Sequence, residues 1–263
     1  MSKLINKIKN INDNKKYIIT LILLSLIQFL IITRFQYVYG SQVDWVNQHT
    51  LFPNYFRNLF YETGNLFSNF ASHLGSGQNI FYLAYYGLYS PVIMLSYLLP
   101  FIPMNTYIIV TSIIIVIASI ILFYYFLKQN GFSNKLSFFV SLLFLFSSSF
   151  IFHSHRHIMF MNYMPFLILS LMGVKRYFDS NKSFLLIINI FLMILSSYYY
   201  SVSGIIACII YGLFLYLGKC DKFIIKDFIK KMSVFLFRII IGVLLASILL
   251  LPVIYVILNG RNS

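Results

Sequence analysis

Residues 17–45, YIITLILLSLIQFLIITRFQYVYGSQVDW, decide the fold class. The stretch follows Lys15 and Lys16, continues as a long apolar run, and reaches its first carboxylate at Asp44. About 20 apolar residues in a helix span the roughly 30 Å of hydrocarbon in a bilayer. We therefore predict a first transmembrane helix over residues 17–39, which stays in place as a signal anchor because no small-residue cleavage site follows it.

The composition extends this prediction to the whole chain. Hydrophobic residues make up 60% of the 263 residues, charged residues only 10%, and the mean hydropathy is +0.83. A soluble domain could not cover so much apolar surface. The apolar runs do not alternate with polar residues as the strands of a membrane barrel would, and a helix satisfies its own backbone in lipid. These features predict an all-α polytopic membrane protein with a single transmembrane domain over residues 1–263.

The positive charge predicts orientation. The net charge is +14, and every lysine falls in one of four clusters beside an apolar run, within residues 3–16, 128–135, 175–182 and 219–231. Basic residues favour cytoplasmic loops and the headgroups of anionic lipids. We therefore expect a multi-pass protein of the cell membrane with a cytoplasmic basic tail at residues 1–16, and no nucleic-acid partner because no reading module is present. The two cysteines imply no disulfide framework.

Orientation and run length together predict about seven crossings. Six follow the first one within residues 106–258, and residues 259–263 end outside. The turns between crossings are expected at the histidine-rich residues 153–157 and at the serine- and tyrosine-rich residues 198–203. The expected later crossings are residues 106–127, 136–152, 158–174, two helices within 183–217, and 233–258.

The first outer loop, residues 40–105, is expected to hold interfacial elements. Apolar residues repeat along residues 51–60, with Thr50, Asn54, Arg57, Asn58 and Glu62 on the other face. This pattern is typical of an amphipathic helix lying in the interface, and residues 66–74 predict a second, shorter one. Residues 80–103 are apolar but are interrupted by prolines, so we predict a broken or re-entrant segment.

Asp44 is the candidate catalytic residue. A carboxylate at the boundary between water and lipid can act as a general base once partial desolvation raises its pKa. The alternative is a carboxylate that caps a helix or lies at the interface. Arg57 and Arg156 are candidate ligands of a lipid phosphate, because arginine binds phosphate through two parallel contacts. The alternative for these two, and for Arg34 and Arg261, is an anchor to headgroups.

Histidine and glycine residues supply the remaining candidates. His153, His155 and His157 could suggest a metal, but a zinc site would need a further ligand, so hydrogen bonding to phosphate is the preferred interpretation. We expect no metal and no cofactor. Gly75 and Gly77 predict a flexible turn, with substrate binding by that turn as the alternative.

Four features of the chain resemble the YfhO family of bacterial membrane proteins. They are Asp44 with Gln48 after the first crossing, the aromatic amphipathic segment, the sequence SHLGSGQN at residues 72–79, and YYGLYSP at residues 85–91. Residues 144–173 and 196–204 are similar to later parts of the family, so the resemblance covers nearly the whole chain.

This resemblance implies a membrane glycosyltransferase of the GT-C architecture. Such an enzyme takes a sugar from a polyprenyl-phosphate donor on the outer face, and YfhO relatives are associated with glycosylating lipoteichoic acid or similar envelope polymers. Asp44 matches the acid of the first outer loop, and the seven crossings with helices in that loop match the core module. Asn162 stands where family members often carry an acidic residue. Family members are longer, so we expect a truncated copy.

The resulting hypothesis is a single displacement at the outer face. Asp44 deprotonates an acceptor hydroxyl, Gln48 orients Asp44 or a sugar hydroxyl, and Arg156, with Arg57 and His157, stabilises the departing phosphate. The alternative is a non-catalytic membrane protein, either a subunit of a lipid-carrier flippase or an assembly partner, or an inactive fragment of the enzyme. Neither the sugar, the acceptor nor the oligomeric state follows from the sequence.

Overall fold

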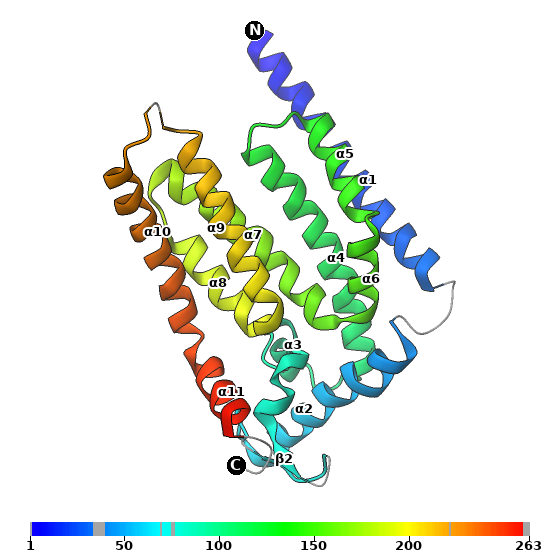
Figure 1. Ribbon diagram of the computed structural model, residues 1–263. Helices are drawn as coiled ribbons and strands as arrows, with labels where there is room; N and C mark the ends of the chain where they lie inside the picture. Colours follow the sequence, from blue (N-terminus) through cyan, green and yellow to red (C-terminus); the bar gives the residue numbers. More distant parts are fainter. Residues whose placement is uncertain (1, 34–39, 69, 75–76, 221, 260–263) are drawn as a thin grey trace.

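The computed structural model describes residues 2–33, 40–68, 70–74, 77–220 and 222–259, and it is a bundle of helices with a small layer of short elements at one end (Figure 1). Helices long and apolar enough to cross a membrane are α1 (Ser2–Thr33, with its apolar part from Asp13), α4 (Met104–Gln129), α7 (Ile158–Ser180) and α9 (Tyr198–Leu217). Their length and composition confirm the prediction of an all-α polytopic membrane protein.

Two further candidate spans are bent pairs of helices. The helices α5 (Asn134–Leu145) and α6 (Ser148–Arg156) meet at 52°, and α10 (Ile225–Leu245) and α11 (Ser247–Asn259) meet at 71°. Helix α8 (Phe184–Ser196) is apolar but short. The described residues thus hold four candidate spans, or up to six with the bent pairs. The seven predicted crossings correspond to these six and α8.

The crossing predicted over residues 136–152 corresponds to a bent pair of helices. Helix α5 ends at Leu145, and the hydroxyl oxygen of Ser147 accepts a hydrogen bond from the backbone N–H of Phe150, so a new helix begins there. A side chain that satisfies an N-terminal N–H is what starts a helix at serine. The expected turn at residues 153–157 is consequently helical up to Arg156, and the chain turns at His157.

The other expected turn and the last expected crossing also have different bounds. The break between α8 and α9 is at Ser197, which is extended and caps α9 by accepting from the backbone N–H of Tyr200. Residues 198–203 are therefore the first turns of α9 and not a loop. The last predicted crossing, residues 233–258, begins earlier, at Ile225, and is interrupted at Ala246.

The bundle core consists of apolar side chains from α1, α4, α5 and α7 to α10. Leu21, Ile120, Leu186, Ile190 and Phe235 are fully or almost fully buried in it. The closest backbone approach is between α7 and α8. A β-carbon added at Gly173 would lie 2.6 Å from the backbone nitrogen of Leu186. Small residues let membrane helices approach this closely.

The layer of short elements lies at the end of the bundle opposite the N-terminus, where Figure 1 shows α2, α3 and β2. The amphipathic helix predicted near residues 51–60 is confirmed as α2 (Leu51–Thr63). The second, shorter helix predicted over residues 66–74 was wrong, because Leu66 and Phe67 lie in a turn and Phe70–Ala71 form a strand. The layer consists of the π-helix η1 (Gln42–His49), α2, the antiparallel strands β1 (Phe70–Ala71) and β2 (Gln78–Asn79), the 3-10 helix η2 (Ile80–Tyr86), α3 (Pro91–Leu95) and the 3-10 helix η3 (Ser96–Leu98).

Residues 80–103 form a broken segment, as predicted, and Gly87 allows this segment to pack against the bundle. Gly87 ends η2 with φ +73°, and a β-carbon there would lie 2.7 Å from the carbonyl oxygen of Ser196, at the end of α8. Its own carbonyl accepts from the N–H of Ser90, and Pro91 follows at the start of α3. Only glycine allows both the left-handed backbone and the close approach.

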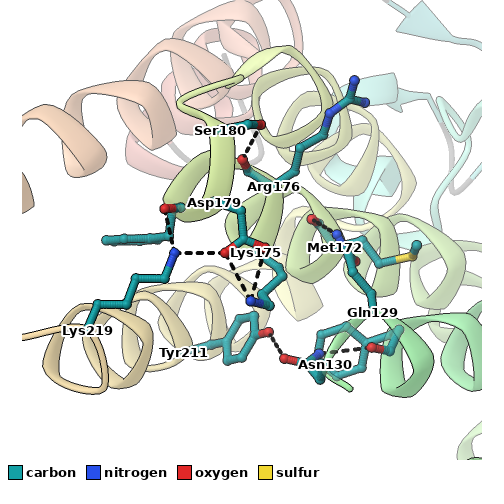
Figure 2. A network of polar contacts seen from close by, with 11 residues as sticks. Gln129, Asn130, Met172, Lys175, Arg176, Asp179, Ser180, Tyr211 and Lys219 are labelled. Carbon is teal, nitrogen blue, oxygen red and sulfur yellow. Dashed lines mark hydrogen bonds and ion pairs between the residues drawn. The ribbon is translucent and has the colours of Figure 1, made fainter. Parts of the chain in front are cut away.

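A polar network ties helix ends together at the opposite side of the molecule (Figure 2). Asp179, near the end of α7, lies 3.0 Å from the ammonium of Lys175 and 2.7 Å from that of Lys219, which follows α9. The hydroxyl of Tyr211 donates to the side-chain oxygen of Asn130 at 2.6 Å and so joins α9 to the end of α4.

The contact between α7 and α8 gives the first test. We expect Gly173→Val to lower the free energy of unfolding by about 1–3 kcal/mol, because the added carbons meet backbone and not a flexible side chain. The measurement is thermal unfolding of the purified protein in detergent. Gly218→Ala is the control, since the nearest atom to its added carbon is 3.3 Å away. Equal melting temperatures for the two variants would contradict the close contact.

Candidate functional site

Asp44 lies in the first turn of η1, just after the chain leaves the segment that follows α1. Its backbone N–H donates to the hydroxyl of Ser41 at 3.3 Å, and that hydroxyl lies 3.3 Å from the Oδ2 of Asp44. A carboxylate is favoured at a helix N-terminus because the helix dipole is positive there. The side chain remains 29% exposed, so a ligand can reach it. The helix-cap interpretation and the catalytic one are thus both compatible with this position.

Arg156 faces Asp44 across the site. Its Nε lies 4.0 Å from the Oδ2 of Asp44, and its guanidinium carbon lies 5.0 Å from the ring centre of Phe152. The arginine ends α6, so the break between α5 and α6 helps to aim it at η1. An exposed ion pair at this separation stabilises a fold by about 0–1 kcal/mol at most. The guanidinium is 46% exposed and can therefore exchange Asp44 for an anionic ligand.

His157 joins the same site from the turn between α6 and α7. Its Nδ1 lies 3.1 Å from the hydroxyl of Tyr200 and 3.5 Å from the Nδ1 of His153. Burial lowers the pKa of His157, as does His153, whereas Asp44 raises it and Arg156 lowers it. The imidazole is therefore neutral near pH 7 and can act as a hydrogen-bonding group beside the carboxylate.

His49 is a site residue that the sequence analysis missed. It is 1% exposed, and its Nε2 lies 3.1 Å from the carbonyl oxygen of Arg156. A carbonyl only accepts, so Nε2 carries the proton. Burial, together with His157, lowers the pKa of His49 to about 4, although its bond to the Arg156 backbone and Asp44 act in the opposite direction. Its position one π-helical turn after Asp44 was the only signal in the sequence.

Tyr85 and Tyr86 form one wall of the site. Their ring centres are 4.0 Å apart, and the ring of Tyr86 also meets that of His49 at 5.8 Å. Burial raises the pKa of Tyr85 well above its ordinary value, and a hydrogen bond with Tyr86 and the charge of Asp44 add to the shift. The phenol of Tyr85 therefore stays protonated and can donate. The sequence analysis placed these residues in a broken segment and in the stretch YYGLYSP that carries the family resemblance, but not at the site.

Other predicted binding residues are not brought to Asp44. Arg57 was expected on the polar face of α2 but is 4% exposed, and it donates to the carbonyl of Ile102 at 3.0 Å and lies 3.5 Å from Asn54. Its charge is occupied in joining α2 to the turn before α4. The side chain is thus buried and not on an exposed polar face as expected, and its role as a phosphate ligand stays a prediction.

The remaining predicted binding residues are Gln48, Gly75 and Gly77. Among the described contacts, Gln48 makes no hydrogen bond to Asp44 or Arg156, although it lies in the same π-helix. Gly77 has φ +93° and its N–H donates to the carbonyl of Leu74, so it shapes the turn between β1 and β2. Gly75 lies outside the described residues, as do Arg34 and Arg261.

Two apolar grooves lie near the site, one at Arg156 and the other at η1. One, of about 610 Å³, reaches Arg156 and is lined by Ile32, Phe146, Ser148, Ile151, Phe152 and His155. The other, of about 490 Å³, lies between η1, α2 and the start of α4, and its polar lining groups include Thr50, Asn54 and Asn105. Within the described ranges, no three His, Cys, Asp or Glu side chains are arranged to hold a metal ion.

The family can now be compared with this geometry. The family described as bacterial membrane protein YfhO matches residues 16–263. The chain belongs to the YfhO family. The match confirms the resemblance noted at residues 72–79 and 85–91, and it covers every helix from the apolar part of α1 onward. Comparison with curated proteins and with solved structures gave no match.

The buried histidine gives a test by pH. The folded-state pKa of His49, about 4, lies below the ordinary value of 6.5, so its contribution to stability is full above pH 6.5. That contribution falls by up to about 1.4 kcal/mol per pH unit as the pH drops from 6.5 towards 4. Nitrogen-15 NMR of histidine-labelled YfhO-family protein in nanodiscs should show His49 neutral, with the proton on Nε2, at pH 5. His49→Gln assigns the signal, and a protonated ring at pH 6 would contradict the burial.

Proposed function

We propose that this YfhO-family protein is a membrane glycosyltransferase of the GT-C type. It would transfer a sugar from a polyprenyl-phosphate donor to a cell-envelope polymer, such as lipoteichoic acid, at the outer face. The observation that carries the proposal is the Asp44 carboxylate 4.0 Å from the Arg156 guanidinium, where an apolar groove ends. The reaction needs a base, an anion-binding group and a groove for the lipid chain at one site.

The proposed reaction is a single displacement. Asp44 takes the proton from an acceptor hydroxyl, whose oxygen attacks the anomeric carbon of the donor. The bond between that carbon and the phosphate oxygen breaks, and the lipid phosphate leaves with the electron pair. Arg156 binds the departing phosphate through its fork of N–H groups, and the neutral His157 and the Tyr85 phenol donate further hydrogen bonds.

The groove beside Arg156 suits the donor's lipid part. Ile32 of α1, Phe146 after α5, and Ile151 and Phe152 of α6 give it apolar walls, and Arg156 and His155 also line it. An amphipathic donor would place its phosphate at the guanidinium and its chain along the groove, because burial of each methylene contributes about 0.8 kcal/mol. A metal has no step in this mechanism.

The proposed orientation has the N-terminus in the cytoplasm. Figure 1 places the α4–α5 connection, the end of α9 and the start of α10 toward the end of the bundle that also holds the N-terminus, and these are the positions of lysine clusters. The layer of short elements with α2 lies at the other end. A positive-inside arrangement therefore gives Asp44 to the outer face.

The rival proposal is a non-catalytic membrane protein: a subunit of a lipid-carrier flippase, an assembly partner, or an inactive fragment of the enzyme. One observation favours it, since Asp44 has a structural use in the first turn of η1 next to Ser41. Under this proposal, an isosteric neutral side chain at position 44 would change nothing.

Substitution of Asp44 separates the two proposals. We expect Asp44→Asn to reduce transfer from radiolabelled polyprenyl-phosphate sugars by about 10²–10⁴-fold, the usual contribution of a general base. Its abundance in membranes should stay unchanged, because asparagine also suits a helix N-terminus. Glu62→Gln, on the exposed side of α2, is the control and should retain full transfer. Undiminished transfer by the Asp44 variant would remove this residue from the mechanism.

Cysteine labelling of intact cells tests the orientation. In a background without Cys208 and Cys220, a cysteine at the exposed position Asn47 should react with an impermeant maleimide. A cysteine at the exposed Lys222 should react only after the membrane is opened. The reverse pattern would place Asp44 in the cytoplasm and end the proposal of outer-face transfer.

A further inference from the structure

We propose that His49 is a positioning residue for the transfer reaction. Its hydrogen bond to the carbonyl oxygen of Arg156 holds the end of α6 against η1 and so sets the distance between Asp44 and Arg156. This inference deepens the proposed glycosyl transfer and rests on it. The residue touches neither donor nor acceptor in this account, because its ring is buried behind the pair.

The argument begins at the end of α6. A helix leaves its last carbonyls without partners in the helix. Arg156 is the last residue of α6, and His157 already turns back to donate its N–H to the carbonyl of His153. The Nε2 of His49 lies 3.1 Å from the Arg156 carbonyl oxygen, so a side chain of η1 supplies the missing donor.

The imidazole of His49 is held in one orientation. Its ring centre lies 5.9 Å from that of Trp45, 5.8 Å from that of Tyr86 and 6.4 Å from that of His157. These rings come from η1, η2 and the α6–α7 turn, so three segments enclose the histidine. A side chain fixed by packing can hold a backbone group to within a few tenths of an ångström.

A hydrogen bond of the same kind occurs at the end of α5, the other helix of this bent pair. Helix α5 ends at Leu145, and its carbonyl accepts from the side-chain amide of Gln28 in α1 at 2.8 Å. Gln28 is also buried. Each half of the bent pair therefore ends on a donor from a distant segment. Only His49 belongs to the element that carries Asp44.

The ion pair cannot set its own geometry. At 4.0 Å between Nε and Oδ2, with both side chains partly exposed, the pair is too long and too solvated to fix two flexible side chains. The backbone of Arg156 is instead fixed by the buried bond to His49. Asp44 and His49 lie in the same short helix, η1, and His49 binds the backbone of Arg156. The bond therefore fixes the backbone of one partner of the ion pair relative to the other.

Two substitutions of His49 test the inference. His49→Gln keeps an N–H donor at comparable reach, whereas His49→Phe keeps an aromatic ring and removes the donor. We expect His49→Phe to lower transfer by about 10–100-fold, in line with the cost of a 1 Å misplacement, and His49→Gln to restore most of it. His73→Phe, at an exposed histidine of the same layer of short elements, is the matched control and should leave transfer unchanged.

A second readout does not depend on activity. Spin labels at the exposed positions Asn47 of η1 and Ser149 of α6 report the distance between these elements by EPR. We expect a narrow distribution for the unchanged protein and for His49→Gln, and a broad or shifted one for His49→Phe. The distance measurement tests the positioning role even if the protein shows no transfer, which would be a failure of the proposed function alone.

The transfer rates and the distance distributions together either support or overturn the positioning role of His49. Loss of transfer with a broadened distance in His49→Phe, and recovery of both in His49→Gln, support the positioning role. An unchanged distance distribution in His49→Phe overturns it, whatever the transfer rate. Equal loss of transfer in His49→Gln and His49→Phe, with normal membrane abundance, also overturns it, because the N–H donor would then not be the property that matters.

Discussion

Backbone carbonyls at the ends of interrupted helices impose the constraint on which the rest of this structure depends. In an apolar bundle no water replaces a missing hydrogen bond, so every break in a span needs a donor from elsewhere. Gln28 supplies one at Leu145 and His49 supplies one at Arg156, and Arg57 donates likewise to Ile102 in the turn before α4. Each donor reaches from a different segment, so the breaks join α1, η1 and α2 to the bundle.

The same breaks create the candidate site. An unbroken helix over residues 134–156 would carry Arg156 along one straight axis, whereas the 52° bend redirects the last turns of α6. The guanidinium then meets a carboxylate from η1, and the turn at His157 adds an imidazole within reach of Tyr200. Two segments far apart in sequence, η1 and the end of α6 with the turn after it, thus supply an acid, a cation and a neutral hydrogen-bonding group at one end of the molecule.

The sequence predicts the class of fold and the location of Asp44, Arg156 and His157 at one site, because apolar length and charge distribution act over whole segments. It does not predict the break at Ser147 and places the break at Ser197 within residues 198–203, because the side chain of one serine among several caps the new helix in each case. It also misassigns Arg57, whose spacing places it on a polar face. Its burial depends on a turn near Ile102 that no local pattern reveals. His49 was missed for the same reason, because its partner lies 107 residues away.

Gly87 has no β-carbon, and this absence determines how closely η2 packs against the end of α8 beside the site. This residue brings η2 against the carbonyl of Ser196, and η2 ends in the tyrosines that stand beside Asp44 and His49. A single methyl group there would act as a spacer between the two layers. It would move Tyr85 and Tyr86 away from the carboxylate and weaken the contact of Tyr86 with His49. The arrangement of the side chains around Asp44 therefore depends on the absence of a β-carbon at residue 87.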